Sequence, residues 1–350
     1  MSKYINIDGR KISTDYPPYI IAEMSANHNG KLDDAFKIID IAKISGADAV
    51  KLQTYHPDTI TINMNTPEFI INGGLWAGQS LYQLYESAFM PWEWHKPLFD
   101  HANKREITIF SSPFDNTAVD LLEDLNAPAY KIASFEAIDI PLIKYVAKTG
   151  KPMIISTGMA DEEEIEEAID AAKGSGCDQL AILHCVSGYP APAEDYNLKT
   201  LDDMRKRFGL VTGLSDHTTD NITAFTSIAL GSSIIEKHVT LDRSGGGPDD
   251  SFSLEPADLK QLCDGAKNAW SALGKVDYSR KTSEQENAKF RRSLYFVKPL
   301  SSGDIILEEH VKSIRPGYGI APKYYNDIIG KKVIQDISMG TAVSWDHIKK

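Results

Sequence analysis

Eight short apolar runs, nearly all followed by a helical pattern, constrain this chain more than any other feature. We interpret these runs as strands at residues 19–22, 49–52, 107–110, 129–132, 153–155, 180–183, 210–214 and 234–235. Strands that alternate with helices indicate a parallel sheet. Eight such units within about 250 residues favour a closed (β/α)8 TIM barrel. An open dinucleotide-binding sheet is disfavoured, because no Gly-x-Gly-x-x-Gly follows the first strand.

The composition is that of a globular protein and argues against several classes of partner. Hydrophobic residues make up 42% and charged residues 25% of the chain, which is ordinary for a soluble domain. The formal net charge of -12 at pH 7, without a long basic block, argues against nucleic acid. The sequence has neither a signal peptide nor the roughly 18 consecutive apolar residues of a membrane span. The three cysteines lack metal-binding spacing, so we expect a reducing, cytoplasmic location.

The 350 residues are more than a barrel requires, and the remainder lies at the C-terminus. We predict a barrel over residues 1–275, a polar linker without periodicity over 276–292, and a small β-rich domain over 293–350. That last domain contains an internal repeat, in which Gly303 precedes His310 by the same spacing as Gly340 precedes His347. Two related turn–strand–helix units are therefore expected, in a domain too small for a large site of its own.

Polar side chains follow the predicted strands at their carboxyl ends, where barrel enzymes place the active site. His217 and His238 end the last two strands, so both can approach one metal ion. Lysines within apolar strands are costly unless they meet an anion. With neighbouring serine hydroxyls, these lysines predict a cradle for a phosphate and a carboxylate. Together with the two histidines, the ring of strand-end residues comprises Glu23, Lys51, Gln53, Ser111, Ser112, Lys131, Ser134, Ser156, Thr157, Gly158, His184, Ser187, Ser215, Asp216, Glu236 and Lys237.

The individual residues leave other interpretations open. Each lysine can extend from a strand edge toward water, and each serine can cap a following helix. Two histidines are an incomplete metal shell, which waters and substrate oxygens would complete around a Lewis acid. A metal-dependent pyruvate aldolase would share the barrel, the metal and the lysines but would gain little from a phosphate cradle. A sugar-phosphate isomerase and a non-enzymatic binding module are further alternatives.

The ordered motifs together resemble the sialic acid synthase family over nearly the whole chain. The matching segments include Ile-Ala-Glu23-Met-Ser-Ala-Asn-His-Asn-Gly, Val-Lys51-Leu-Gln53, Tyr130-Lys131-Ile-Ala-Ser134, Gly213-Leu-Ser215-Asp216-His217-Thr and Glu236-Lys237-His238. Ile314-Arg315-Pro-Gly-Tyr-Gly-Ile is similar to the family's antifreeze-like (SAF) domain. The insertion around Trp76 and the segment beginning at Gly246 look most like the pseudaminic acid synthases. Val186-Ser187 departs from the Thr-Asn or Thr-Thr usual after His-Cys in N-acetylneuraminate synthases.

The resemblance implies a metal-dependent condensation of phosphoenolpyruvate with 2,4-diacetamido-2,4,6-trideoxy-altrose, giving pseudaminic acid and phosphate. N-acetylneuraminate or legionaminate synthesis from another amino sugar is the alternative within the family. His217 and His238 would hold the metal, Mn²⁺ with Mg²⁺ or Co²⁺ as alternatives, while Glu23 handles protons and Glu236 contacts phosphoenolpyruvate. The implied phosphoenolpyruvate ligands are Lys51, Lys131, Ser134, Ser156, Ser187 and Ser215.

The resemblance also implies residues on the sugar side and a partner subunit. Gln53, Tyr189 and Asp249 would orient the sugar, and Arg315 would reach the partner's barrel in a domain-swapped homodimer. The insertion at residues 55–90 leaves two roles open for the aromatic residues in and just after it, either as a wall of the sugar pocket or as packing within the insertion. These residues are Trp76, Tyr82, Tyr85, Trp92 and Trp94.

Overall fold

The computed structural model describes residues 4–349. The chain divides into two compact units, Met1–Gly274 and Lys275–Lys350, each of which is treated by itself below. In the described part of the chain, no helix is both long and apolar enough to cross a membrane.

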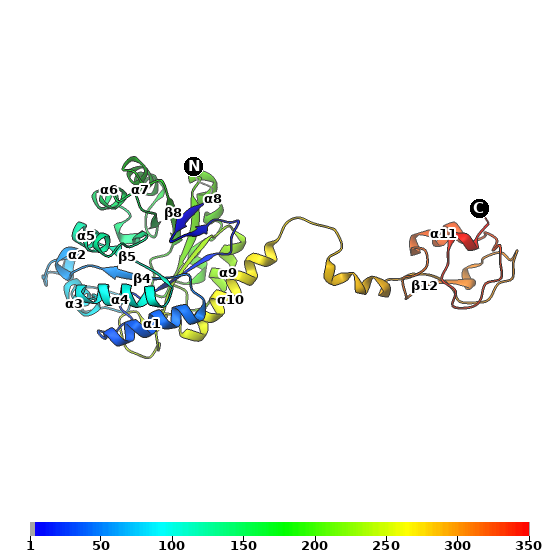
Figure 1. The fold of residues 1–350 in the computed structure, drawn as a ribbon, viewed down its shortest axis with the longest axis horizontal. Helices are drawn as coiled ribbons and strands as arrows, with labels where there is room; N and C mark the ends of the chain where they lie inside the picture. Colours follow the sequence, from blue (N-terminus) through cyan, green and yellow to red (C-terminus); the bar gives the residue numbers. More distant parts are fainter. Residues whose placement is uncertain (1–3, 350) are drawn as a thin grey trace. The chain divides into compact units, whose positions relative to one another are not determined.

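The first unit is a closed barrel of eight parallel strands within residues 4–349, in which β10 pairs with β3 to complete the ring (Figure 1). The predicted TIM barrel is therefore confirmed. Several strands extend further than predicted at their carboxyl ends, so that site residues such as Gln53 lie in strands rather than in loops. The strands are β3 (Tyr19–Glu23), β4 (Ala49–Thr54), β5 (Thr108–Pro113), β6 (Tyr130–Ile132), β7 (Met153–Ser156), β8 (Leu180–Cys185), β9 (Val211–Asp216) and β10 (Ile234–His238).

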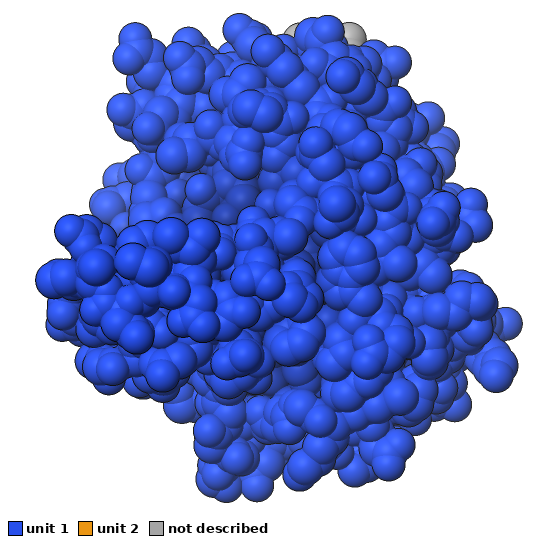
Figure 2. Space-filling view, turned by 90° about the vertical axis from the view of Figure 1, so that its left-hand side faces the viewer, with its two compact units in different colours: residues 1–274 blue, residues 275–350 orange. Residues whose placement is uncertain are grey.

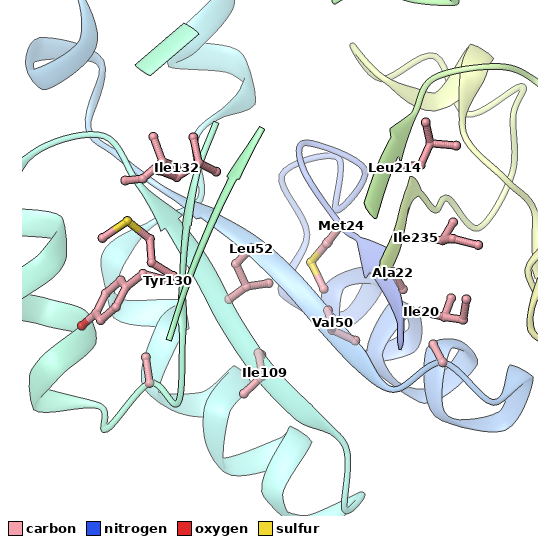
Figure 3. Packing of buried hydrophobic residues seen from close by; sticks show 14 of the residues in the cluster. Ile20, Ala22, Met24, Val50, Leu52, Ile109, Tyr130, Ile132, Leu214 and Ile235 are labelled. Atoms are coloured by element: carbon pink, nitrogen blue, oxygen red, sulfur yellow. The ribbon is translucent and has the colours of Figure 1, made fainter. Parts of the chain in front are cut away.

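Helices surround this barrel and bury the outer face of its strands. The main core cluster contains outward-facing strand residues such as Val50, Leu52 and Ile109 (Figure 3). Helical residues such as Ile38 belong to the same cluster. Because both faces of each strand are buried, the strands are continuous apolar runs rather than alternating ones. The helices are α1 (Leu32–Ser45), α4 (Trp92–Lys104), α5 (Asn116–Asp124), α6 (Ile140–Ala147), α7 (Glu162–Gly174), α8 (Thr200–Phe208), α9 (Ile222–Ala229) and α10 (Pro256–Leu273).

A short hairpin, β1 (Ile5–Ile7) paired with β2 (Arg10–Ile12), closes the amino-terminal end of the barrel. Ile5, Ile7 and Ile12 are buried in the same cluster as the inward-facing residues at the strand starts, among them Tyr19 and Ile234. This hairpin was not predicted from the sequence, because strands of three residues are too short to show a period. The hairpin fills the amino-terminal end and leaves the carboxyl ends of the strands for a site.

The insertion after β4 contains helix α2 (Pro57–Ile60), a 3₁₀ turn η1 (Pro67–Phe69) and helix α3 (Leu81–Ala88). An antiparallel bridge between Ile70 and Ser80 closes a loop that carries Trp76. Figure 2 shows unit 1 from the side on which α2 and α3 lie in Figure 1, and its surface is hollowed there. Because α2 follows the carboxyl end of β4, this side is the one on which we expect the site.

The second unit is a small β-rich body around the antiparallel pair β11 (Ser293–Phe296) and β12 (Val311–Ile314), and it also contains the short helix α11 (Tyr325–Ile328). The 3₁₀ turns η5 (Thr282–Glu284) and η6 (Glu286–Phe290) occupy the segment predicted as a linker.

The internal repeat of the second unit has a structural explanation. Each repeat histidine ends a 3₁₀ turn, η7 (Glu308–His310) or η9 (Trp345–His347). His310 Nδ1 accepts a hydrogen bond from Leu307 N at 3.1 Å, and His347 Nδ1 accepts one from Ser344 N at 3.2 Å. The helix predicted in each copy is a single 3₁₀ turn of three residues, closed by its histidine.

Candidate active site

Four buried charges from four strands form the centre of the site. Lys51 Nζ lies 2.8 Å from Glu23 Oε2 and 3.6 Å from Glu236 Oε1, and Lys131 Nζ lies 2.9 Å from Glu236 Oε1. None of these side chains is more than 5% exposed. Burying charges is costly unless they are paired, and here two lysines balance two carboxylates. Such a balanced cluster can exchange its internal pairs for contacts with an anionic substrate.

The two carboxyl groups of this cluster are in different electrostatic environments. Burial raises the pKa of Glu23, although Lys51 opposes the shift. Burial would also raise the pKa of Glu236, but Lys131 and Lys51 together hold it below its ordinary value. Glu23 is therefore the carboxyl group better suited to take up a proton, while Glu236 stays ionised.

Serine hydroxyls lie close to the charged cluster. The buried side-chain oxygens of Ser156 and Ser187 have no hydrogen-bond partner among residues 4–349. Ser134 Oγ accepts a hydrogen bond from Gly158 N at 3.2 Å, and Ser215 Oγ lies 3.3 Å from Glu236 Oε1. A Cβ atom at Gly158 would collide with the hydroxyls of both Ser134 and Ser187, so this glycine allows them to converge. Unpaired buried hydroxyls beside two lysines are typical of an anion-binding site.

His217 and His238 lie side by side at the ends of β9 and β10, with ring centroids 5.4 Å apart. His217 Nδ1 is 2.8 Å from the carbonyl oxygen of Val186. Because a carbonyl only accepts, Nδ1 carries the hydrogen, so that Nε2 has a lone pair that can bind a metal. The ring also contacts the side chain of Cys185. His238 Nδ1 has no hydrogen-bond partner among the described residues, and Asp249 Oδ2 lies 3.6 Å from it.

These two histidines fit a divalent metal ion as nitrogen ligands. Within residues 4–349, no group of three or more His, Cys, Asp or Glu side chains is arranged as a complete ligand set. A metal at this point would thus depend on oxygen ligands from water or substrate, as expected for an open catalytic site rather than a closed structural one.

A second polar group links the charged cluster to the histidines. Gln53 Nε2 donates to Glu23 Oε1 at 3.0 Å and to Ser25 Oγ at 2.9 Å, and Ser25 in turn donates to Asp249. The ring of Tyr189 lies 4.4 Å from that of His217 and 5.8 Å from that of Trp76, measured between centroids. The residues expected to orient a sugar therefore surround the two histidines.

The structure brings most of the predicted residues to one end of the barrel. Among those predicted for the site, Glu23, Lys51, Lys131 and Glu236 are in direct contact, and the histidines with Asp249 and Tyr189 lie beside them. Arg315 differs, because it is an exposed residue of the second unit. Lys237, which lies between Glu236 and His238, has a structural role, since its Nζ donates to Asp216 Oδ2 and to two backbone carbonyls beyond β9.

The sequence placed Ser111 and Ser112 together at one strand end without distinguishing them, and it gave Ser25 no role. Ser112 Oγ accepts from Lys51 Nζ at 3.2 Å, whereas its neighbour Ser111 hydrogen-bonds Thr54. The alternation of side chains along β5 was the available signal, since it places Ser112 and Phe110 on one face. Ser25 has a positive φ of 46°, and this local conformation, which directs its hydroxyl toward Gln53 and Asp249, has no sequence signal.

The aromatic residues of the insertion divide between the two roles left open. Tyr85 packs edge-on against Tyr55, and Trp94 packs against His28. Trp92 Nε1 donates to the Tyr55 carbonyl at 3.3 Å. These residues belong to the packing beneath the insertion, whereas Trp76 extends to Tyr189 beside the histidines.

Comparison with known proteins agrees with this geometry. A sequence model of the NeuB family matches residues 38–278, and one of the SAF domain matches residues 291–349. The pseudaminic acid synthase of Campylobacter jejuni subsp. jejuni serotype O:23/36 (strain 81-176) is 44% identical over 333 residues, which are 95% of this chain and 96% of that protein. The pseudaminic acid synthase of Helicobacter pylori (strain ATCC 700392 / 26695) is 41% identical over 336 residues, covering 95% and 98% of the two chains.

A solved structure supports the same assignment. The crystal structure of the spore coat polysaccharide biosynthesis protein SpsE from Bacillus subtilis matches with a TM-score of 0.67 and 33% sequence identity, and the match covers 99% of each chain. The family model covers well over half of the chain, and the relatives above match nearly all of it. The chain therefore belongs to the NeuB family and is an enzyme of the sialic acid synthase type with a C-terminal SAF domain.

Proposed function

We propose that this enzyme condenses phosphoenolpyruvate with 2,4-diacetamido-2,4,6-trideoxy-altrose to give pseudaminic acid and phosphate. The observation that carries the proposal is the buried pair Lys51 and Lys131, together with the unpartnered hydroxyls of Ser156 and Ser187 at the carboxyl ends of β7 and β8. That arrangement suits a small substrate with both a phosphate and a carboxylate. The choice of sugar is supported by the 44% and 41% identity to two pseudaminic acid synthases.

On the phosphoenolpyruvate side, the lysines would exchange partners. Lys51 and Lys131 are paired with Glu23 and Glu236. The phosphate and carboxylate of the substrate would take over these lysine contacts and recruit the nearby hydroxyls. Each lysine keeps an anionic partner throughout, so that binding avoids the cost of leaving a buried lysine charge unpaired. The hydroxyls are those of Ser134, Ser156, Ser187 and Ser215.

His217 and His238 would hold the divalent ion, which we propose is Mn²⁺, with Mg²⁺ or Co²⁺ as substitutes. When bound, the ion supplies Lewis-acid chemistry that polarises a carbonyl group. The Val186 carbonyl fixes the His217 ring through its Nδ1–H. Gln53, Tyr189 and Asp249 would orient the sugar beside the two histidines.

In the proposed reaction, C3 of phosphoenolpyruvate forms a bond to the aldehyde carbon of the open-chain sugar. The oxygen of a water molecule adds at C2, and the bond between C2 and the phosphate oxygen breaks. The aldehyde oxygen takes up a proton to become a hydroxyl, and C2 becomes a ketone as the phosphate leaves with the second proton of the water. Glu23 is placed to accept and return a proton, while ionised Glu236 would contact the reacting carbon face.

The second unit would complete the site of a partner subunit. We place Arg315 on the sugar bound in the other barrel of a domain-swapped homodimer. The exposure of Arg315 in the described second unit and the SAF assignment of that unit support this role. A cytoplasmic location is supported by the three cysteines, all of them free thiols.

Phosphate release tests this function. Purified protein supplied with Mn²⁺, phosphoenolpyruvate and the trideoxy sugar should release one phosphate for each sugar consumed, and a chelator should stop the release. Pyruvate in place of phosphoenolpyruvate should give no product. Condensation with pyruvate would contradict the proposal and identify the enzyme as an aldolase.

A further inference from the structure

Trp76 connects two loops that lie far apart in the sequence. Its indole Nε1 donates a hydrogen bond to the carbonyl oxygen of Pro248 at 3.0 Å, across 172 positions of the chain. Trp76 belongs to the insertion after β4, and Pro248 belongs to the loop that joins β10 to α10. One side chain thus ties the insertion to the loop next to the histidines.

The loop from β10 carries Asp249 directly after Pro248. Three consecutive glycines precede Pro248 at positions 245–247, and glycines restrict the backbone little. Asp250 anchors the same part of the loop, because its Oδ2 accepts from Asn29 Nδ2 at 3.0 Å and from Gly247 N at 2.8 Å. The bond from Trp76 therefore adds a restraint on the residue immediately before Asp249, which lies 3.6 Å from His238 Nδ1.

The ring of Trp76 also extends the aromatic wall beside the histidines. Its centroid lies 5.8 Å from that of Tyr189, with the planes tilted by 50°. Tyr189 in turn packs on His217 at 4.4 Å and on Phe252 at 5.4 Å. Trp76 is only half-buried, so part of its ring remains free to contact a ligand. An aromatic wall suits methyl and deoxy groups and disfavours a hydroxyl that would lose its water without gaining a partner.

We propose that Trp76 is a positioning and specificity-determining residue of the sugar side of the site. Its N–H holds the loop that places Asp249, and its ring selects a sugar whose nearby end is apolar. This inference rests on the proposed function, since it names the part of the same site that distinguishes a trideoxy diacetamido sugar from a hydroxylated one.

Two substitutions separate the hydrogen bond from the ring. Trp76→Phe removes the N–H and keeps an aromatic surface, and it should raise KM for the trideoxy sugar about 3- to 10-fold, as expected for the loss of one hydrogen bond. Trp76→Ala should also reduce the preference for the trideoxy sugar over N-acetylmannosamine by about 10-fold or more. KM for phosphoenolpyruvate should not change in either variant, because the lysines and serines are untouched.

Trp92→Phe is the matched control. Its indole likewise donates to a backbone carbonyl, that of Tyr55 at 3.3 Å, but it lies under the insertion and away from the histidines. This variant should keep both KM values of the unaltered enzyme. A rise in KM for phosphoenolpyruvate equal to that for the sugar in the Trp76 variants would overturn the specificity role.

Amide hydrogen exchange tests the positioning role without substrate, metal or turnover. Amides of residues 242–250 should exchange faster in Trp76→Phe and Trp76→Ala than in the unaltered chain or in Trp92→Phe. Unchanged exchange in both Trp76 variants would overturn the positioning role. If the unaltered enzyme released no phosphate with any amino sugar, the proposed function would be wrong, and the exchange comparison would still decide whether Trp76 holds the loop.

Discussion

At the scale of single residues, the site depends on side chains whose charge is set by their neighbours. Glu23 and Glu236 have the same functional group, yet burial raises the pKa of Glu23 whereas two lysines lower that of Glu236. The first carboxyl group can exchange a proton, and the second mainly keeps the lysines charged and in place. A substitution of each glutamate should therefore have a different effect.

Glu23→Gln should keep the fold and phosphoenolpyruvate binding but lower kcat by about 10²- to 10⁴-fold, the usual contribution of a general acid–base. The amide can still accept a hydrogen bond from Gln53 but cannot transfer a proton. Phosphate release measures kcat, and calorimetric titration measures binding. Glu123→Gln is the control. Glu123 is a partly exposed residue of α5 that accepts a hydrogen bond from the Tyr130 hydroxyl of β6. A kcat within a few-fold of that of the unaltered enzyme would remove Glu23 from the mechanism.

A buried histidine away from the site should make stability depend on pH. His95 is fully buried, and its Nε2 lies 2.8 Å from Thr54 Oγ1. Burial lowers the pKa of His95 from 6.5 to about 4. Between these two values the unfolded chain binds a proton that the folded chain does not, so stability falls as the pH falls below the unfolded pKa.

His95→Gln removes this titration while retaining a group that can hydrogen-bond Thr54. Between pH 7 and pH 5, the unaltered protein should lose about 2 kcal/mol of unfolding free energy through His95, and the variant should lose that much less. Urea unfolding at the two pH values measures the difference. Parallel pH profiles for the two proteins would show that His95 becomes protonated without disrupting the fold.

At the scale of elements, the strands position the site residues, and glycines in or just after the strands allow neighbouring groups to approach closely. Gly213 lies within β9, where an added Cβ would be 2.5 Å from Ile234 O and 2.6 Å from Leu183 Cδ2. Gly158 lies just after β7, where an added Cβ would meet the hydroxyls of Ser134 and Ser187. Gly213 therefore allows close packing inside the barrel, whereas Gly158 leaves room for the hydroxyls of the anion-binding site.

The same substitution at these glycines should give opposite results. Gly213→Ala should lower the unfolding free energy by about 1 to 3 kcal/mol, because the barrel interior is overpacked. Gly158→Ala should leave stability nearly unchanged but weaken phosphoenolpyruvate binding at least tenfold, since the hydroxyls must rotate away. Thermal unfolding and calorimetric titration measure the two effects. Normal phosphoenolpyruvate binding by Gly158→Ala would contradict the proposal that the hydroxyls of Ser134 and Ser187 form part of the anion-binding site.

Sequence patterns were sufficient to predict the strands of the barrel and the helices between them, but not the short β1–β2 hairpin or the contacts between loops. Each barrel strand is buried on both faces, so that its apolar run is unmistakable, and its carboxyl end identifies residues such as Lys51 and His217. Ser25 was missed because its role depends on a positive φ of 46°. The hydrogen bond from Trp76 to Pro248 joins positions 172 residues apart, and no local pattern encodes such a contact.

At the scale of the whole molecule, the chain carries its proposed site on two separate units. The barrel unit, Met1–Gly274, holds the charged cluster and the histidines, and the second unit, Lys275–Lys350, holds Arg315. In a domain-swapped homodimer each site would combine the barrel of one subunit with the arginine of the other. If so, two variants that are each inactive should recover activity when their subunits are mixed.

Glu23→Gln and Arg315→Ala should each be nearly inactive alone but recover activity when their subunits are mixed. Half of the dimers in an equal random mixture are heterodimers, and in each heterodimer one site joins two intact parts. About a quarter of the activity of the unaltered enzyme should return, measured by phosphate release after subunit exchange. If Arg315 acted on its own barrel, every site would keep one defect and no activity would return.

The most direct test of the central claim compares two sugars under one assay. Purified protein, Mn²⁺ and phosphoenolpyruvate are supplied with either 2,4-diacetamido-2,4,6-trideoxy-altrose or N-acetylmannosamine, and phosphate release is followed. We predict turnover with the trideoxy sugar and none with N-acetylmannosamine. Turnover with N-acetylmannosamine alone would contradict the substrate assignment, and no release with either sugar would contradict the condensation itself.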